Sequence, residues 1–267
     1  MEQLKDPKSL IAATSFRHRP NMGLPARLAE VQPSKSFLAW TRLSEVYLDP
    51  RELRRQKVHG LEPESALPQV DILRTKTLNY MRAHGFRRLG IASPRRQCGK
   101  TTIAANLSLS FARQRDLRTM LFDLDLTNPG LAVRLGLQTR GPKFSALEYC
   151  RRDFDTLCLR AGHNLALSLA TTPSESCAEL LAARHTRDLL ESIETDFEPD
   201  IMLFDMPALL DGDAGLAMLD LVDAVFIVAR ADQTTDQDLI LSEQLLSERT
   251  NCIGTILNKC RFVPSGS

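Results

Sequence analysis

The chain has 267 residues, which is enough for one large α/β domain with an extension or for two small domains. Its formal net charge of +1 provides no overall attraction to nucleic acid, so we expect no nucleic-acid partner. The six cysteines contain no C-x-x-C pair, and no apolar run approaches the roughly 20 residues that span a bilayer. Because the N-terminus also lacks a signal-peptide core, we expect a cytoplasmic protein that reaches the inner face of the plasma membrane only through a partner.

The first 66 residues differ from the rest of the chain. Seven of the fourteen prolines lie at or before Pro68, and apolar residues there show little sustained period. One exception is “FLAWTRLSEVYL” (37–48), where four residues at suitable spacings predict one face of a short helix: Leu38, Thr41, Leu43 and Val46. Since the apolar content is too low for a core, we expect 1–66 to be an extended, partly disordered arm with one docking segment.

From residue 67 onward, short apolar runs alternate with helical patterns. Six runs predict strands, namely 88–93, 118–125, 165–171, 201–207, 224–230 and 252–259. Two of the helical patterns cover 176–197 and 234–250. Strands that are apolar on both faces and alternate with helices predict an α/β fold, a doubly wound and mostly parallel sheet with helices on both faces. We expect one domain over 67–263 and a short tail over 264–267, with ligands at the carboxyl ends of the strands.

The segment “SPRRQCGKTT” (93–102) follows the first of these strands and precedes a helix that we expect to begin near Thr101. Its end matches the phosphate-binding G-K-[ST] loop of three-layer P-loop NTPases, in which main-chain N–H groups and a helix N-terminus bind phosphate. The lysine reaches the β- and γ-phosphates, and the hydroxyl ligates Mg²⁺. The predicted binding residues are Arg96, Gln97, Cys98, Gly99, Lys100, Thr101 and Thr102. An accidental match remains the alternative, because Pro94 replaces the glycine that usually opens such a loop.

Carboxylates end two later strands. Asp123 and Asp125 close “MLFDLD”, and strand alternation places both on the side that faces the phosphate loop. Asp205 closes “IMLFD”, a position typical of a carboxylate that orients the water ligands of a metal. We therefore predict catalytic roles for Lys100, Asp123, Asp125 and Asp205, and a metal site formed by Thr101, Asp123 and Asp205. The alternative is that the aspartates only cap helices or turns.

Four stretches carry a resemblance to a known family: “IASPRRQCGKTTIAANLSLSFA”, “TMLFDLDLTNPGLAVRLGL”, “DIMLFDMPALLDGDAGLAMLDLVDAVFIVARADQTT” and “GTILNKCR”. Through them, residues 67–261 resemble the bacterial tyrosine kinases (BY-kinases) of capsule and exopolysaccharide biosynthesis. These are the CpsD/CapB group and the cytoplasmic domain of Wzc-type co-polymerases, within the MinD/ParA branch of P-loop NTPases. Members of this family carry a proline-containing loop before G-K-[ST], which accounts for Pro94.

The resemblance implies a function, its ligands and its partners. It implies an ATP-dependent protein tyrosine kinase, or a kinase-like regulator, of exopolysaccharide export. ATP and Mg²⁺ would be bound by Lys100, Thr101 and the three aspartates, with Asn258 near the adenine. The implied partners are a membrane-embedded polysaccharide co-polymerase that activates the enzyme and a protein tyrosine substrate, and we also expect homo-oligomers.

Three departures from the family's pattern limit this transfer. Thr127 stands where the family has an arginine, and Gln97 replaces a glycine. The segment “DILRTKT” offers Asp71, Arg74 and Thr77 where the family has E-x-x-R-x-x-R, a motif used for self-assembly; a solvated helix face is the alternative. Of these departures, Thr127 favours a second hypothesis, a MinD/ParA-like ATPase that acts as a nucleotide-switched positioning module without kinase activity.

Tyrosines and one loop arginine complete the prediction. The tyrosines are Tyr47, Tyr80 and Tyr149, and the sequence ends in “CRFVPSGS”. The resemblance implies autophosphorylation of a tyrosine-rich tail, but “CRFVPSGS” contains no tyrosine. We therefore expect phosphorylation of another protein or of an internal tyrosine. Arg95 stands where MinD-type relatives place a lysine that reaches across a dimer, and a solvated loop arginine is the alternative.

Overall fold

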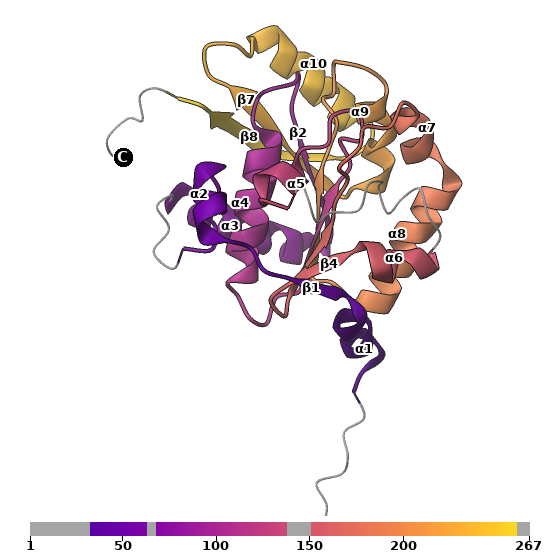
Figure 1. Cartoon of the computed structure of the whole chain (residues 1–267). Coiled ribbons are helices and arrows are strands. Elements are labelled where there is room, and N and C mark those ends of the chain that lie inside the picture. Colours follow the sequence, from indigo (N-terminus) through magenta and orange to yellow (C-terminus); the bar gives the residue numbers. More distant parts are fainter. Residues whose placement is uncertain (1–32, 63–67, 138–150, 261–267) are drawn as a thin grey trace, which may run out of the picture. The chain divides into compact units, whose positions relative to one another are not determined.

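Residues 33–62, 68–137 and 151–260 are described by a computed structural model of the chain. Within them, eight strands form one sheet in the order β1-β4-β5-β3-β6-β2-β7-β8 (Figure 1). The strands are β1 Ser44–Val46, β2 Arg88–Ala92, β3 Thr119–Asp123, β4 Leu159–Ala161, β5 Leu165–Ser168, β6 Ile201–Asp205, β7 Ala224–Arg230 and β8 Asn251–Asn258. All neighbouring pairs are parallel except β4 and β5, which confirms the predicted fold class.

Helices cover both faces of this sheet. They are α1 Lys35–Arg42, α2 Pro50–Arg55, α3 Pro68–His84, α4 Lys100–Ala112, α5 Leu131–Arg134, α6 Arg151–Leu157, α7 Cys177–Ala182, α8 Arg184–Phe197, α9 Ala214–Ala217 and α10 Asp236–Ser247. One buried apolar cluster contains residues of α1 and of α6 to α10, and the other contains residues of α2 to α5. Since successive strand residues face opposite sides, Phe122 belongs to the first cluster and Leu121 to the second.

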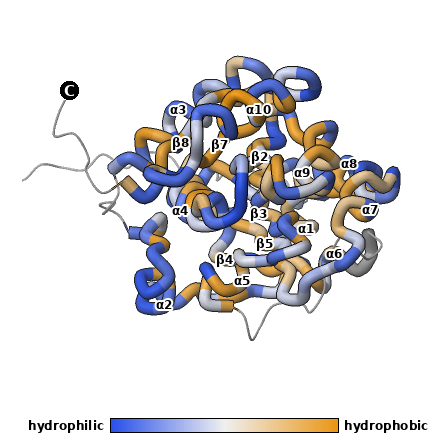
Figure 2. The backbone as a smooth tube through the Cα atoms, turned by 90° about the horizontal axis from the view of Figure 1, so that it is seen from above, coloured by the Kyte–Doolittle hydropathy of each residue, from blue (hydrophilic) through white to orange (hydrophobic). Residues whose placement is uncertain are grey.

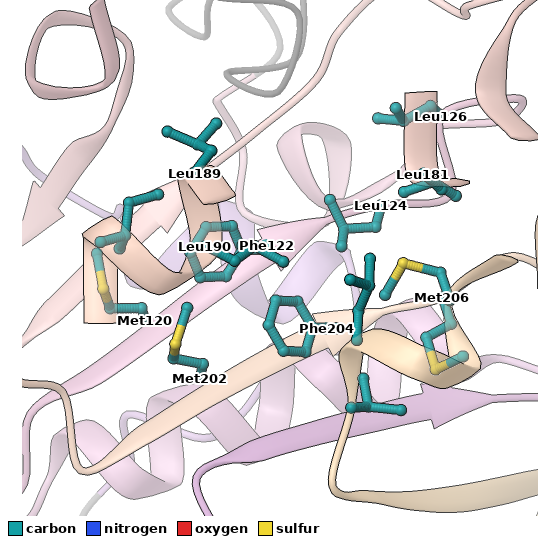
Figure 3. Close-up of a cluster of buried hydrophobic side chains, with 14 of the residues drawn as sticks. Met120, Phe122, Leu124, Leu126, Leu181, Leu189, Leu190, Met202, Phe204 and Met206 are labelled. Carbon is teal, nitrogen blue, oxygen red and sulfur yellow. The ribbon is translucent and has the colours of Figure 1, made fainter. Parts of the chain in front are cut away.

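The central strands β3 and β6 contribute methionine and phenylalanine side chains to the first cluster, namely Met120, Phe122, Met202 and Phe204 (Figure 3). Phe122 of β3 and Phe204 of β6 are fully buried, with ring centroids 5.1 Å apart. Leu189 and Leu190 of α8 close the cluster from above the sheet. Truncation of either phenylalanine to alanine would cost about 3–5 kcal/mol of folding free energy, so this layer holds the central strands in register.

The six predicted strands all occur, with ends that differ by a few residues. The prediction omitted β1 and β4, which have three residues each and are too short to show a period. The prediction also placed a single helix over 176–197, whereas the chain forms two helices there, α7 and α8. The break lies at Ala183, whose extended backbone (φ −65°, ψ 138°) ends α7 and starts α8.

The N-terminal segment departs most from the prediction. The helix ends at Arg42 instead of continuing to Leu48, and β1 then joins the sheet in parallel with β4. The buried side chains of α1 are Ser36, Ala39 and Trp40, so the predicted face with Leu38 and Thr41 is wrong: Leu38 is 45 % exposed. The physical reason is docking, because the face of α1 with Ala39 and Trp40 packs into the apolar cluster.

Trp40 shows how a segment with few apolar residues can dock. Its indole Nε1 donates a 2.8 Å hydrogen bond to the carbonyl of Phe197, and the two rings meet edge to face at 6.1 Å. After β1, Leu48, Leu53 and Val58 are buried in the cluster on the other face. The compact unit therefore begins at Ser34, and the boundary predicted at 66/67 moves to 33/34. The predictions for 1–32 and for the tail 264–267 lie outside the described residues.

Along α2 most residues are hydrophilic, as the mainly blue tube shows there (Figure 2), and the buried residue of this helix is Leu53. None of the helices in the described ranges is long and apolar enough to cross a membrane. The carboxyl ends of β2, β3 and β6 lie at the centre of the sheet, and the site is assembled at this edge.

Candidate active site

The phosphate loop and the acidic residues meet at one edge of the sheet. β6 lies between β2 and β3, and its last residue, Asp205, is the register partner of both Ile91 and Asp123. The loop 93–99 leaves β2 at this edge and enters α4 at Lys100. Three adjacent parallel strands therefore bring together the lysine and the carboxylates that the sequence places far apart.

The loop conformation requires two residues with positive φ. Gln97 has φ 63° and Gly99 has φ 98°. A Cβ atom added to Gly99 would lie 2.3 Å from Nδ2 of Asn258, so no larger residue fits without a shift. At the start of the loop, the carbonyls of Ser93 and Pro94 accept backbone N–H bonds of 2.9 and 3.0 Å from Leu209 and Leu210. Pro94 fits because this turn uses its carbonyl and needs no N–H group.

Lys100 is buried and paired. Its Nζ donates a 2.6 Å bond to Oδ2 of Asp125, and the Thr127 hydroxyl donates a 3.1 Å bond to Oδ1 of the same carboxylate. Burial alone lowers the pKa of Lys100, but the carboxylates of Asp205 and Asp125 outweigh it, and the pKa is raised. Lys100 is therefore charged, and its ammonium is held by Asp125 at the N-terminus of α4.

Asp205 is fully buried, and neither of its oxygens has a hydrogen-bond partner among the described residues. Burial raises the pKa of Asp205 to about 6, and the charge of Lys100 opposes that rise. Thr101 also lowers this pKa, although the two side chains do not reach hydrogen-bond geometry. A buried carboxylate with two free oxygens is costly to keep and indicates a ligand.

The two carboxylate oxygens of Asp123 have different surroundings. Its Oδ2 accepts N–H bonds from Gly130 (3.0 Å) and Leu131 (2.9 Å), so the alternative prediction of a capping carboxylate holds for this oxygen. Its Oδ1 is buried without a partner among the described residues. Burial and then the charge of Asp205 hold the pKa of Asp123 well above its usual value, while the two N–H bonds oppose the rise. This free oxygen is available to a metal, a water or a proton.

A cavity of about 720 Å³ opens beside the loop. Most of the predicted binding residues line it, namely Arg96, Gln97, Gly99, Lys100, Thr101, Thr102 and Asn258. Its wall also contains the cations Lys57, Arg134 and Lys259. A cavity of this size and charge fits a nucleoside triphosphate.

The residues present also fit Mg²⁺. The described ranges contain no cluster of three or more His, Cys, Asp or Glu side chains arranged around a metal. Mg²⁺ usually takes one or two carboxylates and completes its shell with water and phosphate, so such a cluster is not required. The free oxygens of Asp205 and Asp123, with the Thr101 hydroxyl, supply that smaller set.

Asn258 and Cys98 both make contacts within the phosphate loop region. Nδ2 of Asn258 donates a 2.9 Å bond to the Cys98 carbonyl, and Nζ of Lys259 donates a 2.8 Å bond to the Gln97 carbonyl. The end of β8 therefore supports the phosphate loop, and contact of Asn258 with adenine stays a prediction. The Cys98 side chain is 3 % exposed and belongs to the apolar cluster, so only its backbone can serve a phosphate.

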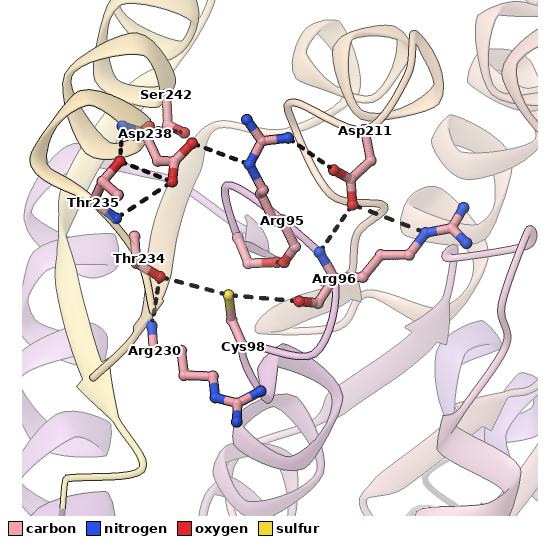
Figure 4. A network of polar contacts seen from close by, with 10 residues as sticks. Arg95, Arg96, Cys98, Asp211, Arg230, Thr234, Thr235, Asp238 and Ser242 are labelled. Carbon is pink, nitrogen blue, oxygen red and sulfur yellow. Dashed lines mark hydrogen bonds and ion pairs between the residues drawn. The ribbon is translucent and has the colours of Figure 1, made fainter. Parts of the chain in front are cut away.

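A second group of charges joins the exposed arginines of the loop to residues elsewhere in the chain, and these pairings were not anticipated from the sequence (Figure 4). Arg95 Nε donates a 3.1 Å bond to Asp238, and the Arg96 backbone N–H donates a 2.9 Å bond to Asp211. Arg95 also approaches Asp211 at 3.6 Å. The sequence contains one local signal for Asp238, the T-x-x-D pattern in which Thr235 and Asp238 form the capping box of α10. The Arg95 side chain is thus engaged within its own chain.

The helix resembling the self-assembly motif is also engaged internally. Asp71 accepts hydrogen bonds from Arg74, Ser110 and Arg113, which join α3 to α4. Thr77 is buried and donates a 2.7 Å bond to the Leu73 carbonyl. These residues support packing within the chain, and homo-oligomer formation through them stays a prediction.

Comparison with known proteins gives the fold relatives. No family model and no curated protein matches the sequence. The kinase domain of the Escherichia coli tyrosine kinase Etk superposes with a TM-score of 0.64 at 22 % identity, covering 78 % of this chain and 81 % of that one. The BceF tyrosine kinase domain gives 0.61 at 19 %, covering 80 % and 91 %. MinD from Pyrococcus horikoshii, complexed with Mg-ADP, gives 0.53 at 20 %, covering 64 % and 69 %. The chain therefore has the fold shared by these proteins.

Proposed function

We propose that this chain is an ATP- and Mg²⁺-dependent protein tyrosine kinase, or a kinase-like regulator, of exopolysaccharide or capsule biosynthesis and export. One observation carries the proposal: Asp205 is fully buried, and among the described residues neither of its oxygens has a hydrogen-bond partner. The charge of Lys100 acts on this carboxylate, and Lys100 lines the cation-rich cavity. The fold shared with the Etk and BceF kinase domains supports the choice of a kinase.

The side chains divide the work of phosphoryl transfer as follows. Lys100 and the N–H groups at the start of α4 bind the phosphates, after Lys100 exchanges its bond with Asp125 for a phosphate oxygen. Bound Mg²⁺ would supply neutralisation of the phosphate charge. Asp205 and Thr101 are the residues that would hold it. Asp123 is the best acceptor for the proton of the substrate hydroxyl, because its Oδ1 has no partner among the described residues and because burial and the charge of Asp205 raise its pKa, which favours its protonated form.

A MinD/ParA-like ATPase without kinase activity is the second candidate. The observation that favours it is Thr127, whose hydroxyl bonds Asp125 where the kinases that this sequence resembles have an arginine. Asp71 and Arg74 also form hydrogen bonds within the chain, so fewer of their polar atoms are available for ring-like assembly. Such a protein would hydrolyse ATP slowly and position a partner.

Incubation of the full chain with radiolabelled ATP, Mg²⁺ and a purified membrane co-polymerase separates the two candidates. Label on tyrosine supports the kinase, and released phosphate alone supports the ATPase. If the chain modifies itself, we expect label on Tyr47, which is 72 % exposed, and not on Tyr80, whose ring stacks on His84 at 4.2 Å. Tyr149 lies outside the described residues. Failure of the wild-type chain to bind any adenine nucleotide rejects both candidates.

A further inference from the structure

A cation of the N-terminal segment lies at the nucleotide cavity. Lys57 comes directly after α2 and lines the same cavity as Lys100, Thr101 and Thr102. We propose that Lys57 binds the α-phosphate of the nucleotide, so that the segment 34–62 completes the nucleotide site. This inference rests on the proposed function, because it names a further residue of the same site.

The backbone of Lys57 is fixed to the helix that carries the phosphate loop. Nδ2 of Asn106 donates to the Lys57 carbonyl at 3.1 Å and to the Thr102 carbonyl at 2.9 Å, and its Oδ1 accepts the His59 N–H at 2.8 Å. Asn106 itself is 3 % exposed. One buried amide therefore joins Lys57 to Thr102, which the sequence already places at the phosphates.

Two further features make this turn rigid. Lys57 has φ 62°, a left-handed conformation that a lysine keeps only when its surroundings enforce it. At Gly60 the chain runs so close to α4 that an added Cβ would lie 2.4 Å from the Asn106 carbonyl oxygen. The buried Val58 side chain anchors the turn between these points. The position of Lys57 is thus set by the fold and not by a free loop.

The wall of the cavity carries positive charge that no carboxylate of the described wall balances. Five cations line it and no carboxylate does, within the described ranges: Lys57, Arg96, Lys100, Arg134 and Lys259. Lys100 is paired with Asp125, and no described carboxylate forms an ion pair with Lys57. The pKa of Lys259 is lowered, first by partial burial and then by the charges of Arg230, Arg134 and Lys57. An anionic ligand relieves this repulsion.

The position of the Lys57 backbone beside α4 indicates which phosphate its ammonium contacts. Lys100 and Thr101 lie at the first residues of the helix, where the β- and γ-phosphates bind. The Asn106 bridge fixes Lys57 beside Thr102, one step further from the γ-phosphate end. The charge of Lys57 therefore acts on the α-phosphate, which both ATP and ADP contain, and not on the γ-phosphate that distinguishes them.

The test compares nucleotide affinities of Lys57→Gln, Lys57→Arg and the control Lys76→Gln by calorimetry with Mg²⁺. Lys76 is an exposed lysine on α3 that does not line the cavity. We expect Lys57→Gln to weaken the binding of ATP and ADP alike by about three- to tenfold, as loss of one exposed, charge-assisted contact does, and to leave adenosine binding unchanged. Lys57→Arg and Lys76→Gln should bind like the wild type.

Three outcomes overturn the inference: equal affinities of Lys57→Gln and the wild type, a loss confined to ATP, or a loss for adenosine as well. Thermal unfolding of all three variants accompanies the titrations, and Lys57→Arg keeps the same backbone position, so a folding defect is separated from a lost charge. The proposed function is tested independently, since it requires nucleotide binding by the wild type and its loss in Lys100→Ala.

Discussion

The phosphate loop separates two groups of charged side chains that differ in almost every respect. The inner cluster consists of Lys100, Asp123, Asp125 and Asp205, which are between 0 and 6 % exposed. The outer network consists of Arg95, Arg96, Asp211 and Asp238, where the Arg95 and Arg96 side chains are 58 and 55 % exposed. The inner cluster has one cation for three carboxylates, with three oxygens left unpartnered among the described residues. The outer network pairs each arginine with a carboxylate.

This difference indicates where function is concentrated. A buried carboxylate without partners is unfavourable in the folded state, and a chain keeps it where a ligand compensates for it. Exposed ion pairs are screened by water and contribute about 0–1 kcal/mol each. We therefore expect inner substitutions to change binding and stability strongly, and outer substitutions to act weakly and in a salt-dependent way.

The largest effect should come from Lys100→Ala. The variant loses the ammonium that binds phosphate and leaves Asp125 buried without its 2.6 Å partner. Nucleotide affinity should fall by about 100-fold or more, and the free energy of unfolding by about 3–5 kcal/mol. Fluorescence titration with a labelled ATP analogue measures the first quantity and urea unfolding the second. Lys76→Ala on α3 is the control, and retained affinity in Lys100→Ala rejects the assignment of the site.

Asp205→Asn should separate function from stability. Since burial raises the pKa of Asp205 to about 6, the ionised form is disfavoured in the folded chain, and the nucleotide-free variant should be more stable by about 1–3 kcal/mol at pH 7.5. The unfavourable free-energy term is fully present above about pH 6, declines as the pH falls, and disappears below about pH 4, where folded and unfolded chains both hold the proton. Mg²⁺-dependent turnover should fall at least about tenfold.

Melting temperatures with and without Mg²⁺ and nucleotide, recorded at pH 7.5 and 4.5, check this prediction. Asp116→Asn replaces an exposed aspartate and serves as the control. A nucleotide-free Asp205→Asn protein that melts below the wild type at pH 7.5 would show that the carboxylate is compensated within the chain. That result would remove the main reason for placing a ligand at Asp205.

Much of the inner cluster could be predicted from the sequence because each signal is local. Asp123 and Asp205 directly follow apolar runs, and Lys100 follows a strand by eight residues, so the rule for parallel sheets is enough to bring them together. The fold class followed from the alternation of apolar strands with helices. Neither rule could give the state of each oxygen, such as the bond of Asp125 to Lys100 or the Oδ1 of Asp123, which has no partner among the described residues.

The outer network and the N-terminal segment could not be predicted in this way. Arg95 and Asp238 are 143 residues apart, and Trp40 and Phe197 are 157 apart. Such contacts leave no period in the sequence, and segment 34–62 is ordered by individual docked side chains instead of by an apolar stripe. The role of Lys57 has the same origin, because its bridge through Asn106 spans 49 residues.

Substitution of Asp211 should have an intermediate effect on stability, and two variants separate the contribution of its charge from that of its hydrogen bond. Asp211→Asn removes the charge near Arg95 and keeps an acceptor for the Arg96 N–H, so it should lower the free energy of unfolding by less than about 0.5 kcal/mol. Asp211→Ala removes the acceptor too and should cost about 1 kcal/mol, with a modest loss of nucleotide affinity because the loop is less well held. Equal effects of the two variants would show that the charge matters and the hydrogen bond does not.

The smallest effect should come from Arg95→Ala. Its guanidinium is half-exposed and bonded to Asp238 and Asp211 of the same chain, so its loss should change stability by about 0.5 kcal/mol or less and leave turnover unchanged at every protein concentration. The measurement is ATP turnover per molecule over a wide range of protein concentration, at low and high salt. A tenfold or larger loss that grows as the protein is concentrated would mean that Arg95 leaves its own carboxylates and acts on a second copy. The outer network would then belong to the catalytic machinery, and the contrast between the two groups of charges would fail at this residue.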